Sequence, residues 1–300
     1  MELGVLPPYR TGVTADPAWI AGFAQHAEAC GFESIYVAEH VVVVPGYASR
    51  YPYAESGRMP LPDDVAIPDP LDLLAFLAGV TSRIRLGTGI LVLPEHHPVQ
   101  LAKRVSTIDQ LSGGRVTLGV GVGWMREELE AMGVDPATRG ARTDECIDAV
   151  LALWRDEQAS FQGAHFRFSG VCSNPKPLQR RADGTPGVPI HIGGHSAAAA
   201  RRAGRMADGF HPLGLAGDLL DERLAQLREA AETAGRDPSS VELSLGGVLD
   251  QLDEERISVA AAAGAHRLVL GTRESDLDKL KDAMSAVADR FLTTIAGGRA

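Results

Sequence analysis

The chain has 300 residues, 45% of them hydrophobic and 33 of them glycine, and its 29 basic and 39 acidic residues give a formal net charge of -10. The chain is acidic overall and shows no basic stripe for nucleic acid or an anionic membrane surface, so we expect neither partner. No apolar run reaches the roughly 18 residues of a membrane span, and the first residues lack the apolar centre of a signal peptide. We therefore expect a soluble, cytoplasmic protein.

The three cysteines are Cys30, Cys146 and Cys172. Their odd number and wide spacing fit neither a disulfide framework nor a metal site. We expect buried free thiols in a reducing compartment.

Short apolar runs alternate with longer amphipathic stretches along the chain. The pattern predicts strands at residues 2–6, 34–38, 84–93, 115–120, 188–192, 209–211, 241–245 and 266–270. Helical periodicity covers residues 17–30, 70–80, 98–111, 125–132 with 138–156, 196–206, 217–234, 253–263 and 275–291. Continuous apolar runs such as SIYVA and RLVLG are typical of parallel strands buried on both faces.

About eight βα units predict one α/β domain over residues 1–300, a (β/α)8 TIM barrel. A doubly wound sheet is the competing architecture, although it rarely needs eight units in a chain of this length. Two insertions, at about 41–68 and 160–187, interrupt the alternation. The first holds Tyr47, Tyr51 and Tyr53 and predicts a packed lid, and the second contains FQGAHFRFSGV, which alternates like a hairpin.

Glycines gather after the predicted strands, at Gly87, Gly89, Gly119, Gly121, Gly123, Gly193, Gly194, Gly246, Gly247 and Gly271. In a barrel these positions are expected at the carboxyl-end face, where active sites are built. Glycine there lets the backbone approach a ligand closely, or it simply turns a strand into a helix.

Gly193 and Gly194 lie directly before a predicted helix that begins at about Ser196. Free backbone N–H groups and the helix dipole make such a terminus a phosphate site, and His195 or Ser196 could add donors. The alternative is a plain serine N-cap.

Glu39 and His40 close the second predicted strand, where acid–base chemistry would lie in a barrel. A structural histidine is the alternative. We expect no metal site, because the first strand, ELGVL, lacks a His-x-His pair and the adjacent His96 and His97 would point apart on a helix. The spacing GVGVG at residues 119–123 does not match the dinucleotide fingerprint.

Four motifs together resemble the luciferase-like flavin and deazaflavin oxidoreductases. They are IYVAEH (35–40), RIRLGTGILVLPEHHPVQLAKRVSTIDQLSGGRVTLGVGVGW (83–124), NPKPLQ (174–179) and IGGHSAAAARRAGRMADGFHPLG (192–214). The similarity keeps motif order over nearly the whole chain. The segment YASRYPYAESGRMPLP, followed by GARTDE, is most similar to the branch that uses the deazaflavin coenzyme F420.

The resemblance implies a (β/α)8 barrel with the cofactor ring at its carboxyl end. It also implies a non-prolyl cis peptide after the third strand, here between Gly89 and Ile90, with Leu91 and Val92 lining the edge of the ring. Glu39 would contact the cofactor, and His40 would handle a proton beside the ring. The cofactor phosphate would be held by Gly193, Gly194, His195, Ser196 and Ala197. Val122 and Gly123 would form a turn against the cofactor.

Two positions depart from known branches of this family. Sugar-phosphate dehydrogenases carry glutamate where this chain has Trp124, so glucose-6-phosphate chemistry is not transferred. Flavin-phosphate luciferases often carry arginine where this chain has Val122, which favours the deazaflavin. We interpret Trp124 and the three lid tyrosines as walls of a substrate pocket, with core packing of Trp124 as the alternative.

The expected function is hydride transfer between F420 and an unidentified small organic substrate, with His40 and Glu39 as the candidate catalytic pair. The alternatives are an FMN-dependent monooxygenase and a non-catalytic cofactor-binding protein. The resemblance also implies a homodimer.

Overall fold

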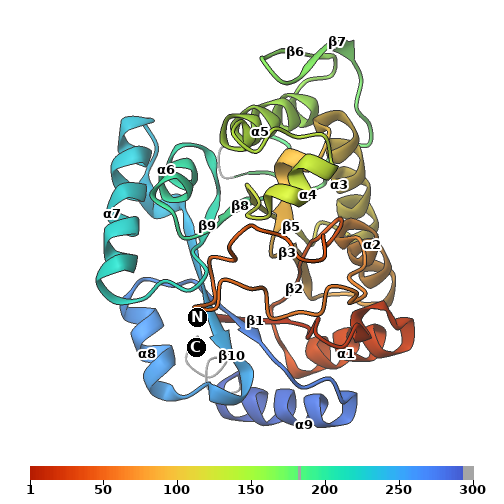
Figure 1. The fold of residues 1–300 in the computed structure, drawn as a ribbon, viewed down its shortest axis with the longest axis vertical. Coiled ribbons are helices and arrows are strands. Elements are labelled where there is room, and N and C mark those ends of the chain that lie inside the picture. The colour runs from red at the N-terminus through yellow and green to blue at the C-terminus, as the bar shows by residue number, and fades with distance from the viewer. Residues whose placement is uncertain (182–183, 293–300) are drawn as a thin grey trace.

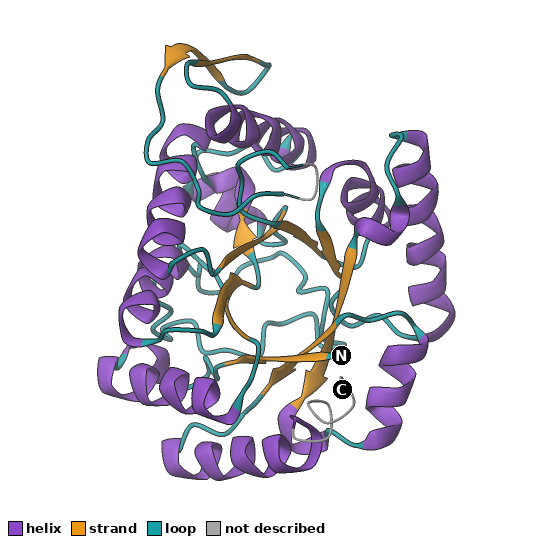
Figure 2. Cartoon of the chain, turned by 180° about the vertical axis from the view of Figure 1, so that it is seen from behind, coloured by secondary structure: helices purple, strands orange, loops and turns teal. Residues whose placement is uncertain are grey.

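The computed structural model describes residues 1–181 and 184–292. The expected domain range of 1–300 also includes residues 182–183 and 293–300, and the second expected insertion includes 182–183. These residues lie outside the described part of the chain. Within the described part, parallel strands follow one another in the order β3-β2-β1-β11-β10-β9-β8-β5, and pairing of β3 with β5 closes the ring. These strands are β1 (Glu2–Leu6), β2 (Ser34–Val37), β3 (Arg85–Thr88), β5 (Val116–Gly121), β8 (Ile190–Gly193), β9 (Gly209–His211), β10 (Glu242–Val248) and β11 (Arg267–Gly271). The predicted (β/α)8 barrel is confirmed, with helices around the strands (Figures 1 and 2).

The helices begin and end close to the positions that periodicity predicts. Asp16 and Asp69 are N-caps whose carboxylates accept backbone N–H groups, and Pro17 and Pro70 occupy the first helical position. No helix among the described residues is long and apolar enough to cross a membrane. The helices are α1 (Pro17–Cys30), α2 (Pro70–Val80), α3 (Pro98–Ser112), α4 (Arg126–Ala131), α5 (Arg139–Arg155), α6 (Ala197–Met206), α7 (Gly217–Thr233), α8 (Glu254–Ala262) and α9 (Leu277–Val287).

The expected strand at 84–93 is wrong as one continuous element. After β3 the chain turns away at Gly89–Ile90, whose peptide bond is cis as the resemblance implies, and pairing resumes in β4 (Leu91–Val92). Leu91 and Val92 pair with Val120 and Gly121 of β5. The apolar run reads as one strand because both halves are buried, and burial does not reveal the bulge between them.

Two glycines in the barrel strands leave space for the aromatic rings of neighbouring strands. A Cβ on Gly87 would lie 2.6 Å from the ring of Tyr36, and one on Gly209 would lie 2.6 Å from His191. Gly87, in β3, pairs with Thr117 of β5. Gly87 lies one residue before the carboxyl end of β3, and its absent side chain makes room for the Tyr36 ring.

A largely buried ion pair lies at the amino-terminal ends of the strands, where Arg267 begins β11 and Glu33 precedes β2. The Arg267 guanidinium donates to both carboxylate oxygens of Glu33, at 2.7 and 3.0 Å, and to Ser244 at 3.1 Å. Burial, together with the charge of Arg267, lowers the pKa of His191 to about 3 and that of His211 to about 4. Both imidazoles are thus neutral at physiological pH, and they fill space rather than carry charge.

The two insertions differ in structure. The strand pair β6 (Ala159–Gln162) and β7 (Arg167–Val171) is antiparallel, which confirms the hairpin, and it projects from the barrel beside α5 (Figure 1). Residues 41–68 form turns and irregular chain without helix or strand, between β2 and α2. We call this segment the strap.

All three cysteines are free thiols. Cys146 is buried, Cys30 is half-buried and Cys172 is exposed. The expectation of buried thiols is correct for Cys146 and wrong for Cys172, which lies beyond the end of β7.

Candidate functional site

The predicted site residues come from the carboxyl ends of separate strands. Glu39 and His40 follow β2, Val122 and Gly123 follow β5, and Gly193 ends β8. Because all barrel strands are parallel, their carboxyl ends meet at one face. The structure therefore places these segments on the same side of the barrel.

His40 is held by a carboxylate from another element. Its Nδ1 lies 2.8 Å from Oε2 of Glu128, in α4, and the two side chains are 12% and 2% exposed. The other oxygen of Glu128 accepts the backbone N–H of Val42 at 3.3 Å. The edge of the Trp124 ring packs against the imidazole, with the ring centres 5.8 Å apart. The site histidine is thus fixed in orientation before any ligand arrives.

Glu39 supports the chain that follows the cis bulge. Its Oε2 accepts the backbone N–H of Val92 at 2.5 Å, and its Oε1 lies 3.0 Å from Nε2 of His96. The Glu39 side chain is 1% exposed. A direct contact of Glu39 with a cofactor stays a prediction, and the contacts present make it an anchor for β4.

A third carboxyl group, that of Glu95, lies beside these two. Both of its oxygens are shut off from solvent, and neither has a hydrogen-bond partner among the described residues. Burial, reinforced by the carboxylates of Glu128 and Glu39, raises the pKa of Glu95 to about 9. Glu95 is therefore a neutral acid at physiological pH.

The cis bulge is packed against glycines of the neighbouring strands. A Cβ on Gly121 would lie 2.7 Å from the Ile90 side chain, and one on Gly193 would overlap that same side chain. Ile90 is half-buried, whereas Leu91 is fully buried in the main core. Of the predicted ring-lining residues, the side chain of Leu91 is thus turned into the core.

Gly123 has a positive φ of 76°, and a Cβ there would lie 2.8 Å from Val92. The turn after β5 consequently needs glycine both for its conformation and for its contact with β4. Val122 before it is half-buried.

The predicted phosphate cradle lies at the start of α6. Ser196 caps the helix by accepting the N–H of Ala199 at 3.1 Å, so the N-cap interpretation is correct for its side chain. The N–H of Gly194 donates to the carbonyl of His211 at 3.2 Å and is already used. The Nδ1 atom of His195 is buried without a partner in the described structure. The first-turn amides and this ring nitrogen are left for an anion.

Aromatic rings of the strap connect the two ends of the site. Tyr51 packs edge-on against Trp124 at 5.0 Å and against Tyr53 at 5.3 Å, and Tyr53 in turn meets His195 at 5.1 Å. Tyr47 is buried against Trp124 at 5.2 Å. The strap is packed as expected, and it runs from the His40 side of the barrel mouth to the cradle. Its role as a lid over a substrate stays a prediction.

The sequence profile described as luciferase-like monooxygenase matches residues 1–293. The chain belongs to this family. An uncharacterized protein from Mycobacterium tuberculosis is 36% identical over 240 residues, covering 77% of this chain and 81% of its own. The F420-dependent glucose-6-phosphate dehydrogenase of Nakamurella multipartita is 32% identical over 241 residues, which is 77% of this chain and 64% of that protein. Among solved structures, an F420-dependent secondary alcohol dehydrogenase in complex with an F420-acetone adduct superposes with a TM-score of 0.75 at 18% identity, covering 96% and 97% of the two chains.

Three residues of this luciferase-like site were missed from the sequence: Glu95, His96 and Glu128. The sequence draws attention to His96 only as one of two adjacent histidines that could bind a metal, the other being His97. In the structure His96 contacts Glu39, whereas His97 caps α3 by accepting the N–H of Val99 at 3.3 Å. An available signal for Glu128 was a carboxylate in a short helix that begins soon after the GVGVGW segment, whose first residues end a strand.

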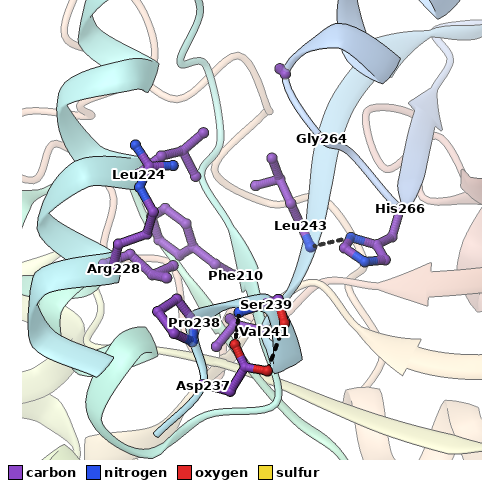
Figure 3. Close-up of a pocket in the computed structure, with 12 residues that line it drawn as sticks. Phe210, Leu224, Arg228, Asp237, Pro238, Ser239, Val241, Leu243, Gly264 and His266 are labelled. Carbon is purple, nitrogen blue, oxygen red and sulfur yellow. Dashed lines mark hydrogen bonds between the residues drawn. The ribbon is translucent and has the colours of Figure 1, made fainter. Parts of the chain in front are cut away.

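The luciferase-like barrel also has an open pocket away from these residues. It lies beside α7 near the starts of β10 and β11, and Phe210, Leu224 and Val241 form part of its apolar lining (Figure 3). Two of its polar groups are engaged locally, since His266 accepts the N–H of Leu243 and Asp237 accepts the N–H of Ser239. No cluster of three or more His, Cys, Asp or Glu residues in the described ranges is arranged to hold a metal ion.

Proposed function

We propose that this protein is an F420-dependent oxidoreductase that transfers hydride between the cofactor and a small organic substrate. The observation that carries the proposal is the alignment of His40, the Gly89–Ile90 bulge and the α6 start on one barrel face. The name of the Nakamurella relative supports F420 as the cofactor. Val122, at the position where flavin-phosphate luciferases often carry arginine, supports it further.

The residues present fit a phosphorylated tricyclic cofactor. An anion at the start of α6 would meet first-turn amides and the unpartnered, buried Nδ1 of His195. Ile90, packed over Gly121 and Gly193, would back a flat ring. When bound, reduced F420 supplies a hydride to an electrophilic carbon.

The chain's own residues would supply the proton and the closed environment. His40 would give a proton to the substrate oxygen in reduction and remove it in oxidation. Glu39 would keep the bulge in place through the N–H of Val92. The strap tyrosines, which form T-shaped ring contacts that extend to His195, would exclude water from the reacting atoms.

A parallel titration with F420 and FMN tests the cofactor assignment. We expect F420 to bind at least about tenfold more tightly than FMN, measured by quenching of F420 fluorescence and by calorimetry. An unrelated (β/α)8 barrel is the control. Tighter binding of FMN would favour a flavin monooxygenase, in keeping with the family's description. Tight F420 binding without turnover of any ketone, aldehyde or enone would indicate a non-catalytic binding protein.

His40→Ala is expected to lower turnover roughly 100-fold or more, because general acid–base catalysis contributes about that much. F420 affinity should stay within about threefold of the wild type, since the cradle is formed by other strands. The assay follows reoxidation of reduced F420 with the best substrate of the carbonyl panel. Undiminished turnover would remove His40 from the mechanism.

A further inference from the structure

We propose that Glu128 is a positioning residue that selects the Nδ1–H tautomer of His40 and leaves its Nε2 as the atom that exchanges a proton with substrate. The inference rests on the proposed function for His40. It adds a residue in α4 that neither the sequence motifs nor the comparisons single out.

The hydrogen bond dictates which nitrogen carries the proton. An ionised carboxylate only accepts hydrogen bonds, so a 2.8 Å contact between Oε2 of Glu128 and Nδ1 of His40 requires a hydrogen on Nδ1. In the neutral imidazole the second nitrogen, Nε2, is then an acceptor. Because the Glu128 side chain is only 2% exposed, water competes little for its oxygens.

Glu128 is itself held in place by the chain that begins the strap. Its Oε1 accepts the N–H of Val42, two residues after His40. A buried carboxylate is costly unless its oxygens are paired, and here one oxygen is taken by each partner. His40, Val42 and Glu128 therefore form one rigid unit.

The two other carboxyl groups near Glu128, those of Glu39 and Glu95, do not take the place of His40 as its hydrogen-bond partner. Glu39 is engaged by Val92 and His96, and Glu95 is unpartnered in the described structure. Burial and the two neighbouring carboxylates raise the pKa of Glu95 to about 9, so it adds no charge at neutral pH. On the remaining side the imidazole meets the Trp124 edge.

This arrangement gives a balanced proton step. In the oxidation direction the O–H bond of an alcohol would break and an N–H bond would form at Nε2, and oxidised F420, when bound, would accept the C–H electron pair as hydride. The resulting imidazolium is stabilised by the adjacent Glu128 carboxylate. In reduction the same proton returns to the carbonyl oxygen.

The test is the tautomeric state of His40, read from the ¹⁵N chemical shifts of its ring in the purified full chain. His40 is assigned by the signals lost in His40→Ala. We expect the wild type to be mainly Nδ1–H. Glu128→Gln removes the charge but keeps the shape, so we expect a mixed tautomer population and at least about tenfold slower turnover.

Glu127→Gln is the matched control. Glu127 lies next in the same helix, but its carboxylate accepts the N–H groups of Ala48 and Ser49 at 2.7 and 3.1 Å instead of binding His40. The control should leave the tautomer unchanged. Glu128→Asp, which retains the charge, should restore the Nδ1–H form at least in part.

Three outcomes separate the inference from the proposed function. A wild-type His40 that is mainly Nε2–H, or a tautomer unchanged in Glu128→Gln, overturns the positioning role, and the wild-type measurement needs no variant to fold. A changed tautomer with full turnover supports positioning and overturns the proton role of His40. A changed tautomer with slowed turnover supports both.

Discussion

Gly119→Ala is expected to destabilise the barrel by roughly 3 kcal/mol, because overpacking against backbone cannot be relieved by a rotamer change. A Cβ on Gly119 would overlap the carbonyl oxygen of Thr88, at the end of β3. The hydroxyl of Thr88 donates to the carbonyl of Gly119 at 2.6 Å, so the two strands are already locked together at this point. The free energy of unfolding in urea measures the loss.

Gly79→Ala is the matched control for this substitution. Gly79 lies exposed near the end of α2, and nothing lies within 4 Å of a Cβ placed there. Alanine should stabilise the helix by about 0.5–1 kcal/mol. The two variants are thus expected to have opposite signs, and equal urea midpoints would contradict the close-approach argument.

The same substitution at Gly119 should also weaken cofactor binding, if the bulge backs the ring. Thr88 is followed directly by Gly89 and Ile90, so a displaced Thr88 moves the bulge with it. F420 affinity of a folded Gly119→Ala protein measures this, with Gly79→Ala again as the reference.

The barrel could be predicted from sequence because its signals are local. Continuous apolar runs, the Asp-Pro helix starts and the alternation in FQGAHFRFSGV each lie within about a dozen residues. The structure confirms the strands and the hairpin within a few positions. The interruption at Gly89–Ile90 was available only through the resemblance, since the buried residues on either side read as one strand.

The candidate site could be predicted only in part because its contacts join distant segments. Glu128 meets His40 across 88 positions, and Glu39 meets Val92 across 53. No periodicity links such pairs. A carboxylate in the polar run REELE looks like a solvated helix face, yet Glu128 is buried. The close approach at Gly87 could not be predicted for a related reason, because it depends on Tyr36 of a neighbouring strand.

Glu95→Gln is expected to stabilise the protein at alkaline pH and to change it little near pH 4.5. Folding raises the pKa of Glu95 to about 9 through burial beside the carboxylates of Glu128 and Glu39. Between the ordinary carboxyl value and about 9, the folded state keeps a proton that the unfolded chain releases. Stability therefore falls as pH rises through this window, by at most about 1.4 kcal/mol per pH unit.

Glutamine cannot ionise, so the variant escapes this penalty. Although the two carboxyl oxygens of Glu95 are shut off from solvent, the residue as a whole is only half-buried, so we expect a discounted gain of about 2 kcal/mol at pH 8. Urea unfolding at pH 5 and pH 8 measures the difference, with Glu130→Gln on the exposed side of α4 as the control. A stabilisation of equal size at both pH values would show that packing, not the retained proton, distinguishes the two side chains. A gain confined to pH 8 would instead identify Glu95 as the neutral acid between the two charged carboxylates that hold the bulge and His40.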